Sequence, residues 1–155
     1  MRRFVLTMIL TTALVMLSNA QDYKTGIGLR IGSGSGFTVK HFINGRSAIE
    51  GLLVTKWHGF DITGLYEKHD QVFDVDHLNW YFGFGAHIGF YDGDYVEWGA
   101  PASTYNVLGV DGIIGLEYSF TEAPINLGLD FKPALNLTGY TGFWAEFGLS
   151  VRYIF

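Results

Sequence analysis

The chain contains no cysteine, which excludes disulfide bonds and thiolate metal sites. After residue 20, no apolar run approaches the roughly 18 residues that a membrane-spanning helix needs. Basic residues are also scarce, 10 against 15 acidic ones, so nucleic acid is not expected as a partner. Yet the sequence is 48% hydrophobic and 17% aromatic. A membrane protein of this composition would have to cross with β-strands that close into a barrel.

Residues 1–20 are typical of a cleaved signal peptide, which would leave 21–155 as one domain. Arg2 and Arg3 supply a positive start, an apolar stretch follows, and Ser18-Asn19-Ala20 is a small-x-small cleavage site. An uncleaved membrane anchor is the alternative, but the apolar stretch is short for one. The signal peptide predicts that the chain is exported through the inner membrane.

Apolar and polar residues then alternate with a period of two, which predicts β-strands along the rest of the chain. The 21 glycines oppose helices. In residues 145–155 every odd position is apolar, while the even positions include Glu146 and Arg152. Tight turns make neighbouring strands antiparallel. Eight strands are expected, over residues 26–32, 37–43, 48–56, 60–67, 78–90, 107–120, 125–136 and 145–155.

Eight antiparallel strands favour closure, because open edges would pair with other chains and are excluded in lipid. The expected fold class is all-β, an eight-stranded antiparallel up-and-down transmembrane β-barrel with a charged, filled lumen. Aromatic residues near strand ends suit the two membrane interfaces. A soluble barrel with its charges outside is the alternative, since alternation does not say which face is wet. The expected lumen charge network consists of Arg30, Lys40, Glu50, Lys56, Asp61, Glu67, Asp111, Glu117, Asp130, Lys132, Glu146 and Arg152.

The leader, the strand rhythm, the aromatic strand ends and the terminal Phe155 together resemble small bacterial outer-membrane β-barrels of the OmpA, OmpX and opacity-protein type. The resemblance covers essentially all of residues 21–155 but carries over no catalytic position. It implies an outer-membrane location, outer-membrane lipid as a partner, and Phe155 as a signal to the barrel assembly machinery. With both termini in the periplasm, the connection 68–77 is unusually long for that side. Either strands extend into it, or the orientation is inverted.

No catalytic, cofactor or metal site is predicted, because no nucleotide-binding, hydrolase or zinc motif occurs. The 68–77 connection contains two histidines and three aspartates, which suit a divalent cation, but their irregular spacing favours a solvated acidic loop. The loop 91–106, with Asp92, Asp94 and Glu97, has the same status. His87 shares the inward face with Ser119 and Ser150. It could serve a hydrolase, or simply be a hydrogen-bonded interior residue.

Three functions remain open. The preferred one is a non-enzymatic outer-membrane barrel with an envelope-structural or surface-interaction role, in which the loop 91–106 contacts a surface ligand through its aromatic and small polar residues. The second is a lipid-modifying enzyme embedded in the barrel, such as a lipid A deacylase or acyltransferase. The third is a soluble secreted β-barrel that carries a hydrophobic ligand.

Overall fold

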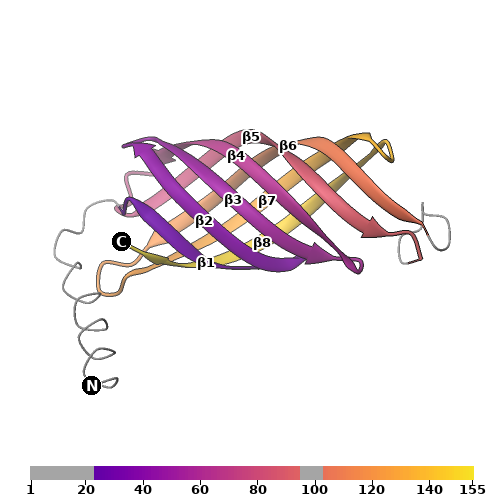
Figure 1. Cartoon of the computed structure of the whole chain (residues 1–155). Helices are drawn as coiled ribbons and strands as arrows, with labels where there is room; N and C mark the ends of the chain where they lie inside the picture. The colour runs from indigo at the N-terminus through magenta and orange to yellow at the C-terminus, as the bar shows by residue number, and fades with distance from the viewer. Residues whose placement is uncertain (1–22, 95–102) are drawn as a thin grey trace, which may run out of the picture.

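Eight antiparallel strands form one closed barrel in sequence order, with β1 paired to β8 (Figure 1). The computed structural model describes residues 23–94 and 103–155. The predicted signal peptide and the centre of the predicted loop 91–106 lie outside them. This part contains no helix, and so none that could span a membrane. The predicted eight-stranded antiparallel barrel is confirmed. Its strands are β1 (Thr25–Gly32), β2 (Ser35–Asn44), β3 (Ser47–Lys56), β4 (Gly59–Gln71), β5 (Leu78–Asp92), β6 (Thr104–Ser119), β7 (Ile125–Thr138) and β8 (Gly142–Ile154).

The predicted connection at residues 68–77 is wrong in its first four residues. Strand β4 continues to Gln71, and its last residues pair with β5, Asp70 opposite Trp80 and Gln71 opposite Asn79. The pattern hid this extension because the outward position there is Lys68 rather than an apolar residue. The remaining connection covers only residues 72–77. Strands β5 and β6 likewise extend into the predicted loop 91–106.

The register fixes the tilt of the strands. Followed from His87 through β6 and β7, the ladder of paired residues reaches Gly142 in β8. Followed the other way through β4, β3, β2 and β1, it reaches Arg152, ten residues further along the same strand. With usual strand spacings, this stagger inclines the strands by about 40° to the barrel axis. The tilt falls in the range of closed barrels.

The start of β1 and the end of β8 lie at the same end of the barrel, which we call the termini end (Figure 1). There Thr25 and Phe155 exchange two backbone hydrogen bonds of 2.9 Å. At the opposite end, the loop end, β3 and β4 are joined by Trp57 and His58 alone, with φ of 49° and 55°. Two left-handed residues in succession match the twist of a two-residue hairpin. The barrel is thus sealed between β1 and β8 at the termini end, and β3 turns directly into β4 at the loop end.

Successive residues of each strand alternate between the interior and the outer surface. The outer positions carry large apolar side chains that remain exposed, among them Phe84 at 68% and Phe147 at 62%. All twelve charged residues expected on the inner face are buried, none more than 8% exposed. The barrel therefore has a charged interior and an apolar exterior.

The close packing of β4 against β5 leads to a prediction on two glycines. A Cβ atom on Gly85 would lie 1.9 Å from the carbonyl oxygen of Gly64, whereas a Cβ on Gly64 itself would meet nothing within 4 Å. We expect Gly85→Ala to lower the free energy of unfolding by about 1–3 kcal/mol, because the strands must separate. Gly64→Ala is the matched control and should change it little. Urea unfolding in detergent micelles measures both, and equal stabilities would contradict the register.

Candidate functional site

The charged interior divides into two clusters of the same composition, each with two bases, three acids and one histidine. All their members are buried. The two clusters lie towards opposite ends of the barrel. The termini-end cluster consists of Lys40, Glu50, Glu67, His69, Glu117 and Arg152, and the loop-end cluster of Lys56, Asp61, His87, Asp111, Lys132 and Glu146.

Lys40 is the centre of the termini-end cluster. Its Nζ lies 2.8 Å from Glu67, 3.3 Å from Glu117 and 3.5 Å from Glu50. Arg152 binds Glu50 through its guanidinium, and its Nε donates to the hydroxyl of Thr38 at 3.0 Å. Five strands contribute to this cluster, so it joins segments that are far apart in the sequence.

The loop-end cluster is a chain of alternating charges. Lys56 contacts Asp61 at 2.6 Å and also Glu146. Lys132 joins Glu146 at 3.2 Å to Asp111 at 2.9 Å. The chain ends at His87, whose Nδ1 lies 2.8 Å from the other oxygen of Asp111. Each carboxylate in the chain therefore has a cation or an imidazole beside it.

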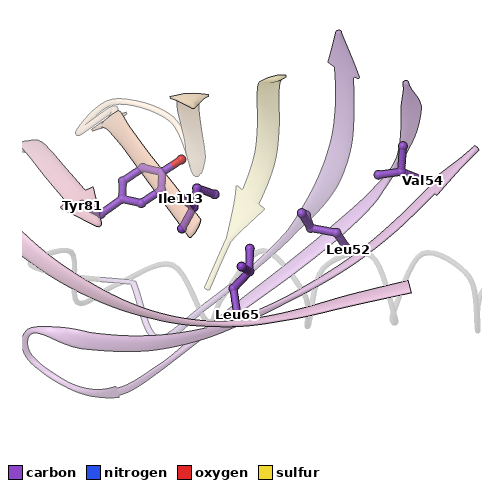
Figure 2. Packing of buried hydrophobic residues seen from close by; sticks show 5 residues of the cluster. All are labelled: Leu52, Val54, Leu65, Tyr81 and Ile113. Carbon is purple, nitrogen blue, oxygen red and sulfur yellow. The ribbon is translucent and has the colours of Figure 1, made fainter. Parts of the chain in front are cut away.

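Between the two clusters the interior is crossed by one isolated ion pair and one apolar cluster. Arg30 and Asp130 bind each other and make no other ion pair in the described part of the chain. The alternation of the sequence did not predict the apolar cluster, which comes from inward positions of β3 to β6 (Figure 2). It consists of Leu52, Val54, Leu65, Tyr81 and Ile113.

Two inward glycines leave the space that large interior side chains occupy. A Cβ on Gly148 would lie 2.3 Å from the guanidinium carbon of Arg30. A Cβ on Gly115 would lie 2.5 Å from the ring of Tyr81. Because any larger residue at these positions would displace the buried group, the glycines determine which side chains can fill the interior.

A cavity of about 530 Å³ opens at the termini end. Its lining includes His69 and Glu117 of the termini-end cluster, Arg46 of the β2–β3 turn, and Tyr23, which precedes β1. The Tyr23 hydroxyl donates to the carboxylate of Glu117 at 3.2 Å, and its ring packs edge-on against Phe42 at 5.1 Å. Tyr23 therefore partly covers the entrance to the termini-end cluster.

The structure does not assemble a serine hydrolase site around His87. Both ring nitrogens of His87 are occupied, one by Asp111 and the other by Asn136 at 2.7 Å. Ser119 lies ten residues along β6 from Gly109, the partner of His87, which is about 33 Å along a strand. The Ser150 hydroxyl, beside Arg30 in the ladder, has no hydrogen-bond partner in the described structure. His87 is a hydrogen-bonded interior residue.

The histidines and aspartates of the predicted connection do not converge either. His69 points into the barrel, whereas Asp70 points outward and lies 3.4 Å from Arg46. No group of three potential metal ligands occurs among residues 23–94 and 103–155. Of the acidic residues in the predicted loop 91–106, Glu97 lies outside the described part.

His69 is the interior residue that the sequence analysis missed, because it was assigned to a connection. The signal was present: Glu67 faces inward, so His69 must also do so if the strand continues. The inward apolar residues were missed for a different reason. A leucine or valine opposite an equally apolar residue gives no alternation by which to assign its face.

Comparison with protein-family models, curated proteins and solved structures found no match to this chain. The class that the structure defines is a closed eight-stranded antiparallel β-barrel with buried charge clusters. The resemblance to outer-membrane barrels remains a prediction from the sequence pattern.

The isolated ion pair allows a test of how the interior charges depend on one another. Arg30→Met leaves Asp130 buried without a partner and should cost about 3–5 kcal/mol of unfolding free energy. The double variant Arg30→Met/Asp130→Leu should recover most of this loss, because no unpaired charge remains. Urea unfolding of the parent, both single variants and the double variant measures the coupling. Additive losses would mean that the two groups do not stabilise each other.

Proposed function

We propose that this protein is an integral outer-membrane β-barrel without enzymatic activity, serving an envelope-structural or surface-interaction role. The observation that supports the proposal is the exposed apolar surface around the whole barrel, which includes residues of every strand. Water-soluble monomers rarely expose contiguous apolar patches of more than a few hundred Å². A lipid environment accounts for this surface, and a closed barrel is the β-structure that leaves no unpaired edge in lipid.

The distribution of charge supports the same environment. A soluble barrel would place its charges in water, yet here the charged residues of the strand centres are buried and their neighbours face out. Aromatic residues gather where outer-membrane barrels meet the lipid headgroups. Tyr118 and Phe120, and Tyr153 with Phe155, form such ring pairs at the termini end, and Phe60 stacks on Phe90 at the loop end.

The interior arrangement favours a barrel that does not conduct. Eight-stranded barrels have an interior just wide enough for side chains to fill. Here the two ion clusters fill the two ends of the interior, and the Arg30–Asp130 pair and the apolar cluster fill the part between them. Any activity at the cell surface would then belong to the loops, chiefly residues 91–106. Phe155, on the outer face at the end of the closing strand, is the proposed signal to the barrel assembly machinery.

Substitutions of two outward residues at different depths distinguish a membrane barrel from a soluble carrier. Phe84 lies midway along β5, and Tyr118 next to the end of β6. In lipid vesicles, Phe84→Arg should lower the free energy of unfolding by about 2–4 kcal/mol, because it places a charge at the bilayer midplane. Tyr118→Arg, near the interface, should cost about 0–1 kcal/mol. Reversible denaturation in phospholipid vesicles measures both. A Phe84→Arg variant as stable as the parent would contradict burial of this face in lipid.

Location is tested directly by fractionation of cells that express the chain. The protein should be extracted from outer membranes only with detergent, and its mobility on a denaturing gel should change when the sample is boiled. Both properties follow from a closed, lipid-embedded barrel. Recovery in the soluble periplasm without detergent would favour the soluble carrier instead.

A further inference from the structure

The buried charges do not balance unless the interior also holds protons. In the described part of the chain, the buried ionic side chains comprise five Arg and Lys residues and seven Asp and Glu residues. The Arg30–Asp130 pair is neutral, so each of the two clusters has a deficit of one positive charge. Each cluster also contains one histidine, and these two are the remaining buried basic side chains among residues 23–94 and 103–155. An uncompensated buried charge is costly, so each cluster is expected to hold one further positive charge.

The surroundings of His69 call for a proton on both ring nitrogens. Nε2 is hydrogen-bonded to a Glu67 oxygen at 3.1 Å, and Nδ1 lies at an ion-pair distance of 3.4 Å from a Glu117 oxygen, without the geometry of a hydrogen bond. A neutral imidazole carries one N–H, so one lone pair would face a carboxylate. The other groups against the ring are Tyr81, which stacks on it at 5.0 Å, and Phe42 at 4.8 Å. Lys40 pairs with the same two carboxylates, and Arg152 lies 4.0 Å from Glu117.

His87 is placed in the same way at the loop end. Nδ1 faces a carboxylate oxygen of Asp111, and Nε2 faces the amide oxygen of Asn136 at 2.7 Å. Lys132 binds the second Asp111 oxygen, and Asp61 of β4 adds a further negative charge nearby. Trp144 of β8 packs against the ring at 5.6 Å. Both ring nitrogens therefore face acceptors. The charged groups named here, Asp111, Asp61 and Lys132, sum to one negative charge.

We propose that the barrel interior is a two-proton site, in which His69 and His87 are both imidazolium at neutral pH and each neutralises one cluster. The two protons complete the ion pairing of the interior. These contacts are all inside the barrel, so the two protons do not depend on whether the barrel resides in a membrane.

The proposal fixes the sign of a pH dependence. A histidine in the unfolded chain loses its proton near pH 6.5. If the folded barrel keeps both protons above that pH, the folded state binds more protons than the unfolded state. Stability is then fully present below about pH 6.5 and falls as the pH rises. Between the pH at which a histidine loses its proton in the unfolded chain and the higher pH at which it does so in the folded barrel, the unfolding equilibrium constant should rise by about tenfold per pH unit. For both histidines together the rise is about a hundredfold per pH unit.

The direct measurement is ¹⁵N NMR of the imidazole rings in the folded full-length protein at pH 7, in detergent micelles. Both nitrogens of His69 and of His87 should give signals of the protonated type. A bare, deprotonated nitrogen would overturn the proposal for that cluster, for instance a His87 Nε2 that accepts from Asn136. Because the parent protein is observed, the result does not depend on whether a variant folds.

Unfolding as a function of pH provides the second measurement. His87→Gln and His69→Gln should each reduce the slope to about tenfold per pH unit, and the double variant should abolish it. His41→Gln is the matched control, because His41 is exposed and lies outside both clusters, with its Nδ1 beside Thr25. Glu67→Gln tests the other group that could carry the proton of the termini-end cluster, the carboxyl group of Glu67. If Glu67 rather than His69 carries that proton, Glu67→Gln will remove half of the slope while His69→Gln leaves it intact, which would overturn the assignment to His69.

Discussion

Every buried charge in this barrel has to find its partner on another strand, and the rest of the structure depends on that requirement. The inner face of a narrow closed barrel has no other place for a charged side chain. Arg152 reaches Glu50, and Lys56 reaches Glu146, across 102 and 90 residues of sequence. These pairs can form only when the strands are in their final register. Register, closure and charge pairing therefore stabilise one another.

Closure in turn sets the division between the two faces. With β8 bonded to β1, no strand edge is left open, and each strand has one inner and one outer face. Polar groups lie inside, where they pair, so the apolar groups lie outside, where only lipid would cover them well. The proposed outer-membrane location is based on this arrangement and not on similarity to another protein. The apolar cluster and the Arg30–Asp130 pair together fill the middle of the interior, between the two ion clusters.

The two clusters also explain why the interior has two histidines. Each cluster has three carboxylates but only two permanent cations, and the third cation is a residue that can gain or lose a proton. A third lysine or arginine would make the balance independent of pH. The proposed pH dependence of stability therefore originates in the interior rather than in the loops.

Alternation along the chain was enough to predict the class of fold and the face of most residues. A strand alternates sides with a period of two, so each polar–apolar pair of neighbours reveals its orientation. That sufficed for the twelve inward charges, for His87 and for the eight strands. It failed at residues 68–71, where Lys68 breaks the pattern and His69 was lost to a supposed loop. It also failed for Leu52 and Val54, because Leu53, which lies between them, is equally apolar. Only the tertiary structure decided which charges pair, how they divide into two clusters and where the apolar cluster lies. Those facts depend on the stagger between strands far apart in the sequence, which no local pattern records.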